Sequence, residues 1–66
     1  MKNTIRVERA KLDITQSDLA EQINVSKQTI LSIEKGKFTP STILALKIAR
    51  YFKVRVEDIF ELEPED

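Results

Sequence analysis

One segment, residues 25–36, carries polar side chains at positions that helical spacing places together. At about 100° per residue, Ile30 and Ile33 share one side of a helix. The opposite side carries Gln28, Leu31, Ser32 and Lys35. Amide, hydroxyl and ammonium groups on a helix surface are suited to hydrogen bonding with a polar partner. We therefore expect this face to meet either water or a partner.

The residue types that most catalytic and metal centres require are missing. The 66-residue chain has no histidine and no cysteine, so it lacks the usual nucleophile–base pairs and the commonest transition-metal ligands. The absence of cysteine also excludes disulfides. We therefore expect no catalytic residue, no metal, no cofactor and no small-molecule ligand, and an enzyme is the least favoured class of protein.

Charge is separated along the chain, although the formal net charge is zero. Residues 1–55 hold all 11 basic residues and five of the 11 acidic ones, whereas residues 56–66 hold six acidic residues and no basic one. Residues 1–55 are therefore basic although the net charge of the chain is zero. A basic region of this kind is compatible with binding to nucleic acid. No apolar run approaches the roughly 20 residues of a membrane span. Because the charged start MKNTIRVERAK also lacks the apolar core of a signal peptide, we expect a cytoplasmic protein without membrane contact.

Five helices are predicted from apolar spacing and from residues that start or stop a helix. They are expected at about residues 4–12, 16–23, 27–35, 40–52 and 56–60. Thr15 and Ser26 are predicted N-caps, because a hydroxyl accepts a hydrogen bond from a free N–H group at a helix start. Gly36 should end the third helix in a left-handed conformation. Pro40 is expected at the first position of the fourth helix.

The two ends of the chain are predicted to form a short antiparallel ribbon. Residues 60–63 alternate apolar and polar side chains, which favours a strand. Residues 1–4 are the only suitable partner within the chain. The predicted fold class is therefore all-α, with five helices and this two-stranded ribbon. A chain of 66 residues is expected to form one domain, residues 1–66.

Two of the predicted helices form a compact pair around the polar face. Residues 16–23 (QSDLAEQI) and 26–36 (SKQTILSIEKG) are joined by a short turn. Ala20 is small where the helices should cross, and Val25 should fill the turn. This is the helix-turn-helix arrangement, at about residues 16–35, in which the second helix enters the major groove of DNA.

The same residues resemble a known family. The run Q-x-x-L-A-x-x-x-x-V-S-x-x-x-I-x-x-x-E consists of Gln16, Leu19, Ala20, Val25, Ser26, Ile30 and Glu34. With Gly36, Pro40-Ser41 and the ending VEDIF, it resembles the Xre family of phage-repressor and Cro-like regulators over about residues 4–60. The chain is most similar to the small dimeric repressors of the cytolysin-repressor type. The resemblance implies a lambda-repressor-like fold of five helices with a two-stranded ribbon.

The resemblance and the chemistry together indicate a set of DNA-binding residues. The set is Gln16, Ser26, Lys27, Gln28, Leu31, Ser32, Lys35, Lys37 and Thr39. The Gln28 amide can donate to N7 and accept from N6–H of adenine, and Lys27 can reach guanine or a phosphate. Lys35, Lys37 and Thr39 are candidate contacts to the DNA backbone.

Alternatives stay open for several of these residues. Leu31 is either an exposed leucine or a contact to a thymine methyl. Gln16 either binds phosphate and braces the recognition helix, as the family glutamine does, or is simply solvated. Lys35 and Lys37 are also favoured at a helix C-terminus by the helix dipole alone.

A structural ion pair is expected between Arg9 and Glu34, which match family positions that tie the first helix to the recognition helix. Two residues depart from the family pattern, since Glu8 stands where an apolar residue is usual and Asp13 where glycine is frequent. We expect that either the first helix is slightly rotated, or that Val7 and Leu12 replace the packing of the missing apolar residue.

A homodimer is predicted through the C-terminal region, about residues 51–62. Its candidate interface residues are Tyr51, Val54, Val56, Ile59 and Phe60. They either close the monomer core or contact a second copy, and we favour the second copy because three or more apolar residues are left over in so small a domain. A dimer is also expected because one recognition helix reads too few base pairs to select a site. A twofold dimer requires a palindromic operator with half-sites about 10–10.5 base pairs apart, or a multiple of that spacing.

These observations predict a sequence-specific DNA-binding transcriptional regulator that acts as a repressor. Its expected partners are double-stranded operator DNA and a second copy of the chain. The alternative is an antitoxin-like module that neutralises a partner protein and regulates its own promoter. That alternative usually requires a segment beyond the helical domain, and only six residues follow Phe60.

Overall fold

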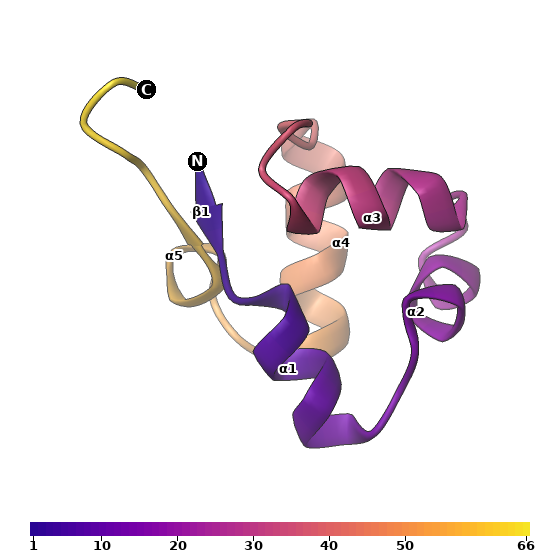
Figure 1. Ribbon diagram of the computed structural model, residues 1–66. Coiled ribbons are helices and arrows are strands. Elements are labelled where there is room, and N and C mark those ends of the chain that lie inside the picture. The colour runs from indigo at the N-terminus through magenta and orange to yellow at the C-terminus, as the bar shows by residue number, and fades with distance from the viewer.

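Five helices and two very short strands make up the chain, which a computed structural model describes over residues 1–66. The elements are β1 (Lys2–Asn3), α1 (Ile5–Leu12), α2 (Gln16–Gln22), α3 (Lys27–Glu34), α4 (Thr42–Phe52), α5 (Val56–Ile59) and β2 (Phe60–Glu61). In Figure 1, α4 runs through the middle of the molecule, with α3 across its upper part and the two strands on the left. The predicted all-α class with a terminal ribbon is confirmed.

Side-chain caps fix the starts of the two helices of the helix-turn-helix. The Thr15 hydroxyl accepts from the Asp18 N–H at 3.0 Å, and the Thr15 N–H donates to the Asp18 carboxylate at 2.9 Å. The Ser26 hydroxyl accepts from the Thr29 N–H at 3.1 Å. Both predicted N-caps are therefore confirmed.

The start of α4 differs from the prediction. The helix begins at Thr42, because Ser41 is its N-cap and accepts from the Leu44 N–H at 3.2 Å. Pro40 lies before the helix as a buried residue instead of occupying its first position. The Ser41 hydroxyl thus satisfies a free N–H group of the first turn. Elsewhere the helix bounds agree with the prediction to within one residue.

The ribbon joins the two ends of the chain. Strands β1 and β2 are antiparallel, with Lys2 opposite Glu61 and Asn3 opposite Phe60. The Thr4 N–H adds a bond to the Ile59 carbonyl at 2.9 Å. The ribbon therefore connects the start of α1 to the end of α5, although its strands are shorter than predicted.

A single apolar core joins all five helices. Its members are Ile5, Leu19, Ala20, Ile23, Ile30, Ile33, Ile48, Ala49, Phe52, Ile59 and Phe60. Val7 and Leu12 do not take over packing in α1, because about half of each side chain is exposed. None of the helices combines the length and the apolar character that crossing a membrane requires.

Candidate nucleic-acid interface

Helix α3 is attached to the core along one side only. Ile30 and Ile33 are almost fully buried, with 0% and 1% of their surface exposed. The turn before α3 is held by a 2.9 Å hydrogen bond from the Val25 N–H to the Ala20 carbonyl. Asn24 enters this turn with φ 59°, in the left-handed region that asparagine tolerates. On the opposite side of α3, Gln28 and Lys35 are exposed and Leu31 and Ser32 are half-buried.

Six of the nine predicted contact residues are exposed. They are Ser26, Lys27, Gln28, Lys35, Lys37 and Thr39. The other three, Gln16, Leu31 and Ser32, are half-buried.

The predicted contact residues do not all line the same hollow. Ser26, Gln28, Ser32 and Lys37 line one shallow hollow over α3 and the loop after it. Gln16 and Lys27 line a second hollow, together with Arg9. Lys35 lines a third, beside β1 and Glu63. Lys35 therefore lies near Glu63, in the acidic C-terminal part of the chain.

Phe38 was missed in the sequence. It lines the same hollow as Gln28 and Lys37, and 49% of its surface is exposed. Phe38 directly follows Lys37, but no pattern in the sequence marks it as a contact to duplex DNA.

The lysines around α3 are free to meet an anion. Lys27, Lys35 and Lys37 are exposed, and the ion pairs of the structure involve other cations. An unpaired ammonium group keeps its full charge available for a phosphate. Three of the 11 basic residues are thus accessible around α3.

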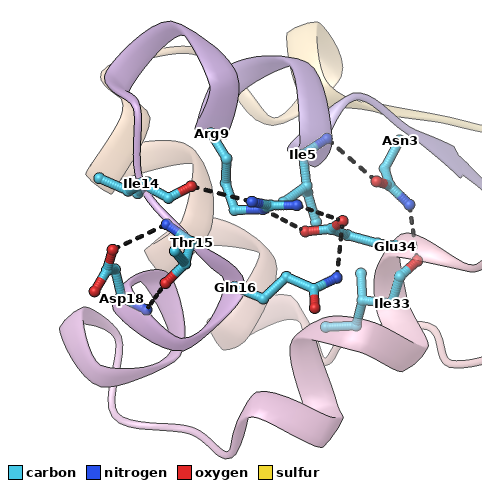
Figure 2. Close-up of polar contacts among 9 residues, drawn as sticks. All are labelled: Asn3, Ile5, Arg9, Ile14, Thr15, Gln16, Asp18, Ile33 and Glu34. Atoms are coloured by element: carbon cyan, nitrogen blue, oxygen red, sulfur yellow. Dashed lines mark hydrogen bonds and ion pairs between the residues drawn. The ribbon is translucent and has the colours of Figure 1, made fainter.

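An ion pair fixes the C-terminal turn of α3 to two other helices. Arg9 donates from Nε to Glu34 Oε2 at 2.7 Å and from Nη2 to Oε1 at 3.0 Å. The Gln16 amide donates to the same Oε1 at 3.3 Å, and Arg9 Nη1 donates to the Ile14 carbonyl at 3.1 Å (Figure 2). The hydrogen bonds to Glu34 raise the pKa of Arg9. Only 4% of the Glu34 side chain is exposed, so loss of Arg9 would leave a nearly buried carboxylate without its cation.

Asn3 makes a second connection to the same turn, which the sequence analysis did not identify. Its amide nitrogen donates to the Ile33 carbonyl at 2.8 Å, and its amide oxygen accepts from the Ile5 N–H at 3.2 Å (Figure 2). The helix end of α3 is therefore held from β1 as well as from α1 and α2.

The predicted dimer residues divide into two groups. Ile59 and Phe60 belong to the monomer core, with 1% and 7% of their surface exposed, so they have almost no surface left for a second copy. Tyr51, Val54 and Val56 are half-buried. Leu62, at the end of the predicted interface region (residues 51–62), is 74% exposed.

Comparisons with known proteins agree with this geometry. A family model described as helix-turn-helix matches residues 5–59. An uncharacterised HTH-type transcriptional regulator of Methanocaldococcus jannaschii is 52% identical over 66 residues, which is 100% of both chains. A second, from Archaeoglobus fulgidus, is 47% identical over 100% of this chain and 94% of its own. The uncharacterised HTH-type transcriptional regulator YgzD of Bacillus subtilis is 44% identical over 100% of both chains.

Proposed function

Because this chain belongs to the helix-turn-helix family of transcriptional regulators, we propose that it is a repressor that binds a palindromic DNA operator as a homodimer. One observation carries the proposal. Helix α3 has a polar outer face and is fixed by two buried isoleucines and a nearly buried ion pair. A rigid helix with free hydrogen-bonding groups is what reading the major groove requires.

Base contacts are assigned to the outer face of α3. Gln28 pairs with adenine through its amide, and Lys27 reaches guanine or a neighbouring phosphate. Ser32 can donate or accept at a base edge, one turn after Gln28. Leu31, which is half-buried, touches a thymine methyl with its exposed part. These contacts provide the sequence preference.

Phosphate contacts are assigned to the residues around this face. They are Gln16, Ser26, Lys35, Lys37 and Thr39. They position the helix and supply affinity without sequence preference. The unpaired ammonium groups of Lys35 and Lys37 support this assignment.

A dimer supplies the second half of the readout. We assign its interface to the exposed parts of Tyr51, Val54 and Val56, together with Leu62. Ile59 and Phe60 support this surface from inside the monomer. Repression then requires only that the bound dimer occlude a promoter, and it needs no catalytic residue, metal ion or cofactor. We place this action in the cytoplasm, where the protein meets DNA.

Selection of bound duplexes from a random DNA library tests sequence specificity. We expect enrichment of two inverted half-sites with centres about 10–10.5 base pairs apart, or a multiple. In fluorescence anisotropy, the selected duplex should bind about 10³-fold more tightly than a scrambled duplex, with affinity falling as salt rises. Equal binding to both duplexes would overturn sequence-specific recognition. Enrichment of one isolated half-site would overturn the dimeric readout.

Transcription in vitro tests repression. A promoter that overlaps the selected site should lose transcription as the protein is added, and the same promoter with the site scrambled should not. Increased transcription from the first promoter would show an activator and overturn the assignment as a repressor.

A further inference from the structure

The side chain of Asn3 makes hydrogen bonds to backbone groups of two helices, at the start of α1 and near the end of α3. The N–H groups of a first helical turn and the carbonyls of a last turn have no partner within their own helices. The Asn3 oxygen accepts from the Ile5 N–H, which opens α1, and the Asn3 nitrogen donates to the Ile33 carbonyl near the end of α3. An amide carries its acceptor and its donor on two separate atoms of one short side chain, so it can bond to both helix ends at once.

The Ile33 carbonyl is a strongly held point of α3. It also accepts from the Gly36 N–H at 2.9 Å, so Asn3 supplies a second bond to the same oxygen. The next residue along, Glu34, is held by Arg9 and Gln16. The last turn of α3 is thus fixed from α1 and α2 through a side chain, and from β1 through a main-chain atom.

The direction of α3 depends on these contacts because the helix is short. Eight residues span about 12 Å, so a tilt of about 10° at one end moves the other end by about 2 Å. Hydrogen bonds to base edges tolerate a spread of only about 0.5 Å in donor–acceptor distance. A small tilt therefore removes base contacts while leaving the longer-range attraction to phosphates in place.

We propose that Asn3 is a positioning residue for base readout, which sets the direction of α3 through its hydrogen bond to the Ile33 carbonyl. This inference rests on the proposed function, in which α3 reads the bases. Asn3 touches no DNA in this scheme. Because β1 pairs with β2, directly after α5, the same amide also links α3 to the region assigned to the dimer.

The variant Asn3→Asp replaces the donor with an acceptor that repels the Ile33 carbonyl. Its carboxylate has the same shape and still accepts from the Ile5 N–H, but it cannot donate to the Ile33 carbonyl. Asn3→Ala removes both bonds. Thr4→Ala is the matched control in the same segment, because Thr4 is exposed and its side chain makes no cap hydrogen bond.

The readout is the ratio of the affinities for the selected and the scrambled duplex, measured at one salt concentration and at a temperature where circular dichroism shows every variant folded. The negative charge of aspartate weakens binding to both duplexes alike, so its effect cancels in the ratio. We expect the ratio to fall about tenfold in both Asn3 variants, as for the loss of one good base contact, and to stay at the wild-type value in Thr4→Ala.

A double-mutant cycle with Gln28→Ala separates positioning from stability. If Asn3 acts through α3, Asn3→Asp should reduce the ratio less in the Gln28→Ala background than in the wild type. A lower melting temperature with an unchanged ratio would show that Asn3 is merely structural and would overturn the inference. Wild-type protein that binds both duplexes equally would instead overturn the proposed function, and the inference with it.

Discussion

At the scale of single residues, Gln28 separates recognition from folding most clearly. Its side chain is exposed, and none of the side-chain hydrogen bonds within the chain involves it. We expect Gln28→Ala to weaken binding to the selected duplex by about 1–3 kcal/mol, because a bidentate base contact is lost. The free energy of unfolding should change by less than about 0.5 kcal/mol. Fluorescence anisotropy and thermal unfolding measure the two effects.

Gln22→Ala is the matched control for Gln28→Ala. Gln22 is also exposed, but it lies at the end of α2 and lines a different hollow, beside Lys47 and Arg50. We expect its replacement to leave the affinity for both duplexes unchanged. If Gln22→Ala weakened specific binding and Gln28→Ala did not, the recognition face would lie on the other side of the molecule.

Ile33, in contrast to Gln28, is expected to contribute to the stability of the fold and not to base contacts. It is 1% exposed in the core beneath α3, so Ile33→Ala leaves a cavity and should lower the free energy of unfolding by about 2–5 kcal/mol. Ile43→Ala makes the same chemical change at a side chain that is 69% exposed, and it should cost less than about 0.5 kcal/mol. Denaturant unfolding measures both. Equal costs at the two positions would contradict the burial of this face of α3.

At the scale of elements, the capping box of α2 makes stability sensitive to acid. Hydrogen bonds from the Thr15 backbone and side chain lower the pKa of Asp18 below 3.8. Because the folded pKa is below the unfolded one, the stabilisation is present above about pH 4 and is lost as the pH falls through the folded pKa. Asp18→Asn removes this titration, although its amide oxygen can still accept from the Thr15 N–H.

Thermal unfolding between about pH 5 and pH 2.5 tests this cap. The melting temperature of the wild type should fall more steeply on acidification than that of Asp18→Asn, and the two proteins should approach each other at the acid end. Asp58 and Asp66, whose pKa values are also lowered by hydrogen bonds, contribute acid sensitivity to both proteins. Parallel curves would show that the carboxylate of Asp18 adds nothing to the cap.

The elements that the sequence predicts well are those determined by neighbouring residues. Thr15 and Ser26 act on N–H groups three residues away, and Gly36 takes φ 75° at the end of α3. The start of α4 was predicted less well, because Pro40 and Ser41 are both good helix-start residues and only the structure shows that the hydroxyl is the cap.

Two kinds of feature are not predicted from the sequence. One is a contact between residues far apart in the chain, and the other is whether an apolar residue is buried in the monomer core or left for an interface. Asn3 and Ile33 are 30 positions apart, and no local pattern links an asparagine to one particular carbonyl. Ile59 and Phe60 have the composition of an interface, but the core of so small a domain takes them up. Arg9 and Glu34 are 25 positions apart, and the resemblance to a family, rather than helical spacing, suggested their pairing.

At the scale of the whole molecule, the charges are arranged so that the lysines near α3 are left free. Several acids of residues 56–66 are engaged elsewhere, since Asp58 pairs with Arg55 and Glu61 lies 3.9 Å from Lys2. The acids that cancel the net charge thus leave Lys27 and Lys37 unpaired. A zero net charge is therefore compatible with binding to a polyanion, because the local distribution of charge decides the attraction.

The proposed dimer makes the most demanding prediction at this scale. Leu62 is 74% exposed within residues 51–62, so Leu62→Asp should leave the monomer fold intact while weakening association. A buried leucine contributes about 1.5–3 kcal/mol, and a twofold interface contains it twice. We therefore expect the dissociation constant of the dimer to rise at least about tenfold in analytical ultracentrifugation.

Leu46→Asp is the matched control, because Leu46 is 54% exposed on α4, outside this region, and the change in charge is the same. Leu46→Asp should remain dimeric; if it dissociates while Leu62→Asp does not, the two copies meet around Leu46 and the assigned interface is wrong.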